Sequence, residues 1–162
     1  MRRSDREVTD PAQVLQIVEL CDCCTLGIND PQEGVPYLLP INFGYETESD
    51  GSIVLYFHGA VQGHKYELIE QNPHVAFEMD CNHQLRSDAS RGYCTMGYAS
   101  VIGRGTIAEV LDHDAKVHAL QLIVDHHHRD SHFTFNEAAV GRTRVLALRV
   151  ERLTCKNYVP RH

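Results

Sequence analysis

The chain has 162 residues, of which 43% are hydrophobic and 23% are charged, so we expect one folded domain, residues 1–162, and exclude a disordered chain. Its 15 Lys and Arg stand against 22 Asp and Glu, and this net charge of −7 argues against nucleic acid or an anionic membrane as a partner. No apolar run approaches the roughly 20 residues of a membrane helix, and residues 1–7 are not followed by an apolar stretch, so we expect a cytoplasmic protein.

The first predicted element is a helix over residues 9–20. Asp10 is a candidate N-cap, and Pro11 suits the first helical position because its missing N–H would have no partner there. Apolar side chains then recur at helical spacing at Val14, Ile17, Val18 and Cys21. We expect this stripe to face the core.

Three extended segments follow, and we expect them to form antiparallel neighbours. Residues 23–28 form the first strand, and residues 35–45 the second, which lies at an edge or breaks near Pro40 because proline lacks the N–H that a central strand needs. The third, residues 53–58, is almost wholly apolar. Polar turns at 29–34 and 46–51 are short enough for hairpin connections.

The middle of the chain predicts a short helix between strands. Residues 64–71 form the helix, which ends before Pro73, and residues 75–80 return to a strand. The polar residues 81–93 are predicted as a mobile connection, and residues 98–111 as a long strand.

The last third of the chain predicts one more helix and one more strand. Asp112 caps a helix of about 15 residues with an apolar stripe at Val117, Leu120 and Val124, residues 126–142 are loop-like, and residues 144–150 form a strand. About six strands and three helices, with strands adjacent in sequence, indicate a β-rich α+β domain folded as an antiparallel barrel.

Eleven histidines and six cysteines raise the question of a metal site. Cys21, Cys23 and Cys24 do not have the paired C-x-x-C spacing of zinc ligands, so reduced and mostly buried cysteines are expected. Residues 126–132 hold four histidines, which could bind a transition metal, but a solvated loop is the favoured reading. We expect His113 and His118 at the surface and predict no metal site.

The segment from His58 to Lys65 carries the clearest chemical content. Gly59 and Gly63 would let a ligand approach the main chain, and the free N–H groups at the start of the following helix, with His64 and Lys65, would form a phosphate cradle. The alternative is an ordinary strand-to-helix turn with a solvated lysine.

A second candidate is Asn42, whose amide lies in the apolar stretch 37–44 and therefore needs hydrogen-bond partners. It would offer them either to a heterocycle or to its own main chain.

Four stretches together resemble the pyridoxamine 5′-phosphate oxidase-related flavoproteins, and within them the nitroimidazole-resistance (Nim-type) proteins. They are RRSDRE (2–7), VPYLLPINFGYE (35–46), LYFHGAVQGHKYELIEQNPHVAFEMD (55–80) and YASVIGRGTIAEV (98–110). The resemblance runs from residue 1 to about Lys156. It implies an antiparallel split β-barrel with peripheral helices, which forms a homodimer and binds FMN between the subunits.

The resemblance also implies roles for individual residues. The flavin ring would be lined by Pro40, Ile41 and Asn42. The ribityl chain would run beside Phe57, His58 and Gly59. The phosphate would be held by His64 and Lys65. The partner subunit would reach the flavin through Ser100, Val101 and Ile102. His58, near the reactive face, would contact substrate and is the candidate catalytic residue.

The chain departs from true pyridoxamine phosphate oxidases at its end, because it has no Trp and lacks their Arg- and Trp-bearing tail. Vitamin B6 oxidation is therefore not expected. Near the end, Cys155 stands where relatives often carry glycine, which argues against a special main-chain role there.

The resemblance implies an FMN-dependent oxidoreductase that reduces nitroaromatic, nitroimidazole-like or other small electrophilic compounds. A flavin-binding carrier or sensor without efficient turnover is the first alternative. A haem- or metal-binding split-barrel protein is the second. The absorbance spectrum of the purified protein distinguishes flavin, haem and neither.

Overall fold

The computed structural model describes residues 3–128 and 133–160. Its helices are α1 (Pro11–Leu20), α2 (His64–Gln71), α3 (His113–His127) and α4 (Glu137–Gly141), with 3-10 turns at Ser4–Arg6 and Ala89–Arg91. Its strands are β1 (Glu7–Val8), β2 (Cys24–Ile28), β3 (Tyr37–Ile41), β4 (Phe43–Thr47), β5 (Ile53–Ala60), β6 (His74–Asp88), β7 (Tyr93–Glu109) and β8 (Thr143–Tyr158). No helix within these described residues is long and apolar enough to cross a membrane.

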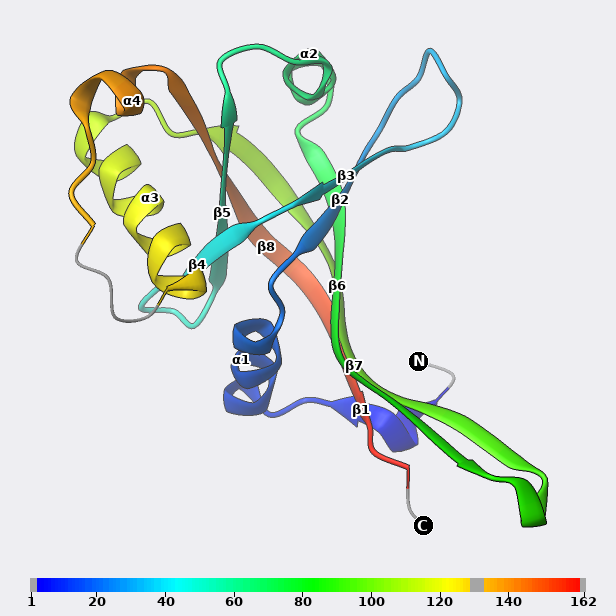
Figure 1. The fold of residues 1–162 in the computed structure, drawn as a ribbon. Helices are drawn as coiled ribbons and strands as arrows, with labels where there is room; N and C mark the ends of the chain where they lie inside the picture. The colour runs from blue at the N-terminus through cyan, green and yellow to red at the C-terminus, as the bar shows by residue number, and fades with distance from the viewer. Residues whose placement is uncertain (1–2, 129–132, 161–162) are drawn as a thin grey trace.

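The strands form one antiparallel sheet in the order β3-β2-β6-β7-β8-β5-β4, with β1 added to β8. β3 and β4 lie at opposite ends of this order, yet only Asn42 separates them in sequence. The stretch 37–47 therefore pairs first with β2 and then with β5, and the sheet curls until its two edges meet along it (Figure 1). This confirms the predicted β-rich α+β barrel and the position of Pro40 on an edge strand.

The core fills the inside of the barrel, where alternate strand residues point inward. Phe43, Phe57 and Leu26 are fully buried there. The predicted stripe is buried too, with Val14, Ile17 and Val18 on α1 and Cys21 at its C-cap. Asp10 caps α1 by accepting from the Ala12 N–H at 3.4 Å, as its sequence position predicts.

The connection predicted over residues 81–93 is wrong. β6 continues to Asp88 and β7 begins at Tyr93, so the two strands form a long hairpin that projects from the barrel, with a register shift between Cys81 and Gln84 (Figure 1). Polar side chains misled the prediction, because both faces of this arm lie outside the core and the usual apolar alternation is lost.

The region after Asp112 confirms the prediction in part. α3 has the predicted cap at Asp112 and the predicted length of about 15 residues. It therefore includes His126 and His127, for which the prediction of a solvated loop is wrong, and the His126 side chain is only 3% exposed. α4 and the C-terminal half of β8 lie outside the predicted elements. The buried face of α3 is Ala119, Leu120 and Ile123, while Val117 and Val124 are half-buried. His132 lies outside the described residues.

All six cysteines are unpaired. Cys21, Cys24 and Cys155 are buried, as expected, and burial raises the pKa of each thiol, to about 11 for Cys155. Cys81 is half-buried, and Cys23 and Cys94 are exposed.

Candidate functional site

The predicted cradle lies where β5 ends and α2 begins. Gly63 precedes the helix with φ +156°, a backbone conformation that favours glycine, and its carbonyl accepts the N–H of Tyr66 at 3.0 Å. The first N–H groups of a helix, here those of His64 and Lys65, have no acceptor within the helix. Two main-chain donors therefore accompany the lysine.

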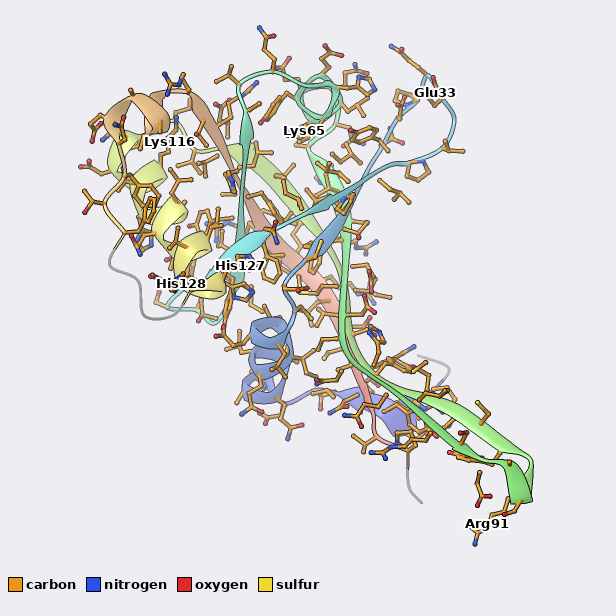
Figure 2. All side chains as sticks on the ribbon, in the orientation of Figure 1. Glu33, Lys65, Arg91, Lys116, His127 and His128 are labelled. Carbon is orange, nitrogen blue, oxygen red and sulfur yellow. The ribbon has the colours of Figure 1, made fainter. Side chains whose placement is uncertain are left out.

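Lys65 reaches back from α2 over the end of β5 (Figure 2). A Cβ placed on Gly59 would lie 3.0 Å from the Lys65 Nζ and 3.0 Å from the Tyr66 hydroxyl, so a larger residue would crowd the space beside the ammonium. Tyr66 is fixed by donating its hydroxyl to the Ala60 carbonyl at 2.7 Å. The sequence therefore brings Gly59 and Lys65 together as predicted.

Arg144 adds a second cation to this cluster, one that sequence reasoning missed. It lies opposite Gly59 in the β5–β8 ladder, and its guanidinium is 3.9 Å from the centre of the Tyr66 ring. Residues directly opposite on antiparallel strands share a face, which places Arg144 on the side of Lys65. Because ladder register is not visible in sequence, only the structure could identify it.

The electrostatics of the cradle favour an anion. Arg144 is paired with Glu109, but among the described residues no carboxylate pairs with Lys65. Burial, and then the positive charge of Arg144, lower the pKa of Lys65. A bound phosphate would relieve this strain on the ammonium, since an opposite charge at close range favours the charged form.

The His64 side chain contacts two carboxylates, whereas the sequence analysis expects it to contact a phosphate. Its Nδ1 lies 3.1 Å from Glu67 Oε2 and its Nε2 lies 3.2 Å from Asp30 Oδ2. These carboxylates, Glu67 first, raise the pKa of His64. Both ring nitrogens therefore contact acidic groups, and a phosphate contact by this side chain remains a prediction that requires its rearrangement.

Asn42 marks the point where the barrel is split. β4 pairs with β5 only from Phe43 to Thr47, so the main chain of residues 58–60 has no strand partner on that side within the described chain. Asn42 is exposed and donates its side-chain Nδ2–H to the Asp22 carbonyl at 2.9 Å. The side chain is thus held by main chain, which was one of the two alternatives, and Ile41 beside it is half-buried.

His58 lies on the other face of β5 from the cradle, because neighbouring strand residues alternate and Gly59 faces Lys65. It is exposed, whereas Phe57 is fully buried and can offer only its main chain. A ligand that contacts both Lys65 and His58 must therefore pass the open edge of β5 beside Asn42.

His127 is the residue that sequence reasoning missed on this face. It ends α3 beside β4 (Figure 2). Burial and the positive charges of His126 and His58 lower its pKa, while a hydrogen bond to the Phe43 main chain acts in the opposite direction. His58 is thus close enough to His127 to lower its pKa. His127 belongs to the histidine run that was predicted as a solvated loop.

Ser100, Val101 and Ile102 lie on β7, two strands away from β5 in the sheet order. Val101 points into the core and is fully buried, while Ile102 points outward and is 52% exposed. The structure does not bring these residues to the cradle within one chain.

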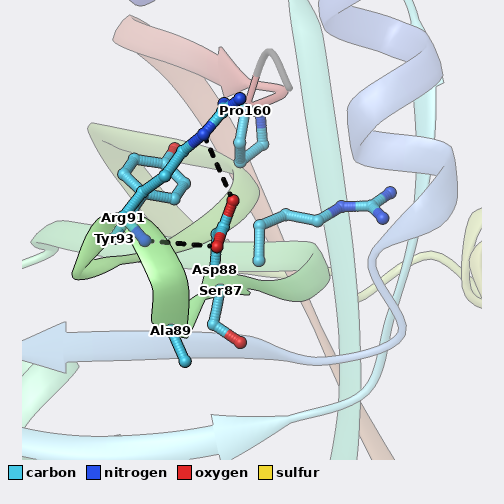
Figure 3. Close-up of a pocket in the computed structure, with 7 residues that line it drawn as sticks. Ser87, Asp88, Ala89, Arg91, Tyr93 and Pro160 are labelled. Carbon is cyan, nitrogen blue, oxygen red and sulfur yellow. Dashed lines mark hydrogen bonds and ion pairs between the residues drawn. The ribbon is translucent and has the colours of Figure 1, made fainter.

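A separate hollow of about 880 Å³ lies at the tip of the β6–β7 arm (Figure 3). The carboxylate of Asp88 is used there to hold the turn, since it accepts the N–H groups of Ser90 and Arg91 at 3.0 and 3.3 Å. None of the predicted site residues lines this hollow.

Comparison with known sequences decides the family. The sequence profile of the family described as pyridoxamine 5′-phosphate oxidase matches residues 10–157, which is nearly the whole chain. This chain belongs to that family. Among functionally curated proteins, a sequence search finds no match.

Solved structures agree with this member of the pyridoxamine 5′-phosphate oxidase family in fold. A candidate 5-nitroimidazole antibiotic resistance protein from Bacteroides thetaiotaomicron is 31% identical, with 93% of this chain and 85% of that chain covered and a TM-score of 0.80. The flavocytochrome Anf3 from Azotobacter vinelandii is 20% identical, with 99% and 72% covered and a TM-score of 0.77. An FAD- and haem-binding protein from Mycobacterium smegmatis is 18% identical, with 96% and 74% covered and a TM-score of 0.79.

Proposed function

We propose that this protein is an FMN-dependent oxidoreductase that reduces nitroaromatic or other small electrophilic compounds. The observation that carries the proposal is the cradle at the start of α2, where Lys65 has no carboxylate partner among the described residues and the glycine at position 59 leaves space beside its ammonium. A terminal phosphate monoester, which FMN has, suits two free main-chain N–H groups and a lysine.

The rest of the cofactor would follow the open edge of β5. The phosphate of FMN would lie at Lys65, and its ribityl chain would lie beside the main chain of residues 57–59. Its ring would lie near Pro40, Ile41 and Asn42. When bound, FMN supplies transfer of electrons or hydride, so the protein needs no nucleophile of its own. What this chain adds is orientation and a source of protons.

His58 is the proposed proton donor to the reduced substrate. Its imidazole is exposed beside the split, and imidazole is the side chain that exchanges protons near neutral pH. The neighbouring His127, whose pKa is lowered, gives up its proton readily once it is protonated and could return that proton to His58.

We also propose that the functional unit is a homodimer with the cofactor between subunits. The outward face of the central strands exposes Ile102, and Leu85 and Met96, which are paired on the β6–β7 arm, are 63% and 45% exposed. A second copy would cover these apolar side chains and bring its Ser100–Ile102 to the flavin ring of the first.

The test is the absorbance spectrum of the purified protein, followed by titration of FMN into the apoprotein. The proposal requires flavin bands, then reoxidation of the anaerobically reduced flavin when a 5-nitroimidazole is added. Flavin that no nitro compound reoxidises would favour a carrier or sensor. A haem Soret band without flavin would overturn the assignment of FMN, and the relatives named for haem binding make this outcome worth recording.

A further inference from the structure

The guanidinium of Arg144 carries hydrogen-bond donors that its ion pair with Glu109 does not use. Arginine presents several N–H groups in a planar fork, and within the described chain only Nη2 has an acceptor, the Glu109 Oε2. The side chain is 24% exposed, and none of its unpartnered nitrogens is buried. A ligand can therefore reach the unused donors of Arg144.

Arg144 and Lys65 lie on the same face of the sheet and contact the same aromatic ring. Arg144 is the cross-strand partner of Gly59, and a Cβ on Gly59 would lie 3.0 Å from the Lys65 Nζ. The centre of the Tyr66 ring lies 3.9 Å from the Arg144 Cζ and 4.6 Å from the Lys65 Nζ. A phosphate group accepts hydrogen bonds through three oxygens that point in different directions, so two cations on one face can share it.

Glu109 does not cancel the charge of Arg144 at the position of Lys65. The pKa of Lys65 is lowered first by burial and then by the positive charge of Arg144, although Arg144 is paired with Glu109. The two cations therefore repel each other across the cradle. An anion that lies between them is attracted to both.

The Glu109 carboxylate can separate from Arg144 at little cost. Glu109 is the last residue of β7 and its side chain is 27% exposed, so water can solvate the carboxylate once the ion pair opens. Its only hydrogen bond within the described chain is the one from Arg144. A phosphate monoester carries a charge of about −1.5 to −2 at neutral pH, more than a carboxylate, and competes well for a guanidinium.

We propose that Arg144 is a second ligand of the phosphate group bound at Lys65, and that Glu109 is a counter-ion which this phosphate displaces from Arg144. The inference rests on the proposed function only for the phosphate at the cradle and needs no redox chemistry. Glu109 thereby weakens phosphate binding and favours release of the ligand. In the competing arrangement, Arg144 keeps Glu109 and the phosphate contacts Lys65 alone.

The first test is titration of FMN, and of riboflavin, which lacks the phosphate, into the apoproteins of wild type, E109Q and R144Q. E109Q should bind FMN roughly two- to fivefold more tightly, the range of a partly exposed ion pair. R144Q should bind FMN about tenfold more weakly or worse, the value of a charge-assisted hydrogen bond. Neither variant should change the affinity for riboflavin. FMN binding that is unchanged or weaker in E109Q, or unchanged in R144Q, would overturn the proposal.

The double variant E109Q/R144Q tests whether Glu109 acts through Arg144. It should bind FMN about as R144Q does, because Glu109 then has no guanidinium to occupy. A gain over R144Q as large as that of E109Q over wild type would show only general repulsion by the carboxylate and would refute displacement.

Two further variants control for charge and folding. E48Q is the matched control, since Glu48 pairs with Arg149 further along β8, and it should leave both flavin affinities unchanged. R144K keeps a cation and should recover most of the FMN affinity that R144Q loses. Failure of R144K to recover it, in a protein that melts like the wild type, would mean that the charge at position 144 does not hold the phosphate.

Inorganic phosphate separates this inference from the flavin. In an NMR titration without FMN, phosphate should shift the main-chain N–H of Lys65 and the guanidinium ¹⁵Nε of Arg144, with tighter binding in E109Q. A wild type that binds phosphate in this way but not FMN would refute the flavin proposal and support the anion site. Phosphate that shifts Lys65 and leaves Arg144 unchanged, or that does not bind at all, would overturn the inference.

Discussion

The Nε2 of His64 lies 3.2 Å from the Oδ2 of Asp30, and this contact joins the start of α2 to the turn that follows β2. Asp30 is only 4% exposed, and its other oxygen accepts the main-chain N–H groups of Gln32 and Glu33 at 3.1 and 3.2 Å. The carboxylate therefore orders its own turn and positions the helix that carries Lys65. The histidine next to the cradle positions this helix, whatever it contributes to a ligand.

Stability should depend on pH through this contact. The pKa of His64 is raised above 6.5 by Glu67 and Asp30, so its contribution is fully present below pH 6.5 and is lost as pH rises through the raised pKa. The pKa of Asp30 is lowered below 3.8, mainly by the Glu33 N–H and then by His64, so its contribution is lost only as pH falls through that lower value. Between about pH 4 and 6.5 both are present.

The measurement is the melting temperature of the wild type and of His64→Gln from pH 5 to 9. The difference between them should be largest near pH 6 and shrink as pH rises. His113→Gln is the control, because His113 is an exposed histidine whose Nε2 lies 3.5 Å from Glu137. A gap that stays constant from pH 6 to 9 would show that the His64 charge contributes nothing.

Replacing Lys65 should affect the ligand and not the fold. Lys65→Met removes a half-buried ammonium that lies beside Arg144 and has no carboxylate partner in the described chain, so the apoprotein should melt at the same temperature or higher. FMN affinity should fall roughly 10- to 100-fold, the value of a charge-assisted hydrogen bond. Lys65→Arg keeps the charge and should retain most of the affinity. Equal FMN affinity in all three proteins would exclude Lys65 as the phosphate contact.

A substitution of Gly44 tests how closely α3 packs on β4. A Cβ at this position would lie 2.5 Å from the main-chain N of Ile123 and from the main-chain carbon of Leu122, and main-chain atoms of a helix cannot rotate away. Gly44→Ala should therefore destabilise the protein by about 1–3 kcal/mol or more in urea unfolding. Gly27→Ala is the matched control, since its Cβ would meet nothing closer than 3.7 Å. Similar costs for the two variants would contradict this packing.

Local signals in the sequence predict much of the fold. The cap at Asp10, the helix that ends before Pro73 and the strand at the apolar run 53–58 depend on neighbours in sequence, and the structure confirms them. The β6–β7 arm could not be predicted in the same way. Most of its residues are polar and both its faces lie outside the core, so no apolar alternation distinguishes a paired strand from a loop, and the pairing across the hairpin is visible only in the structure.

The candidate site also contains some residues that the sequence predicts and others that only the structure identifies. Gly59 and Lys65 lie close in sequence, and the strand-to-helix turn between them predicts their contact. Arg144 and His127 reach the site through ladder register and through the docking of α3 on β4, which no short pattern encodes. Alternation along β5 places His58 and Gly59 on opposite faces, and what this means for a ligand depends on where β4 begins, which the sequence does not show.

The electrostatic effect of His58 on His127 predicts that a substitution of His58 changes the titration of His127. The pKa of His127 is lowered by burial and by neighbouring charges that include His58. His58→Gln removes one of these charges, so the pKa of His127 should rise toward its ordinary value, as followed by NMR of the ring protons. His74→Gln replaces an exposed histidine on β6 and should leave the titration of His127 unchanged. An unchanged pKa in His58→Gln would mean that the two rings do not interact, and proton return from His127 would be withdrawn.

Two exposed apolar residues, Ile102 and Leu111, allow a test of the proposed dimer interface. Ile102 is 52% exposed on the outward face of β7, beside buried Val101, and Leu111 is 82% exposed just beyond the end of the same strand. If a second copy covers the sheet face, Ile102→Glu places a charge in that contact and should weaken the dimer at least tenfold. Size-exclusion chromatography with light scattering should then show a shift from dimer to monomer. The affinity for FMN should fall in parallel. Leu111→Glu adds the same charge outside that face and should leave both unchanged. A wild-type monomer, or an Ile102→Glu protein that remains dimeric, would show that a second copy does not complete the flavin site at residues 100–102.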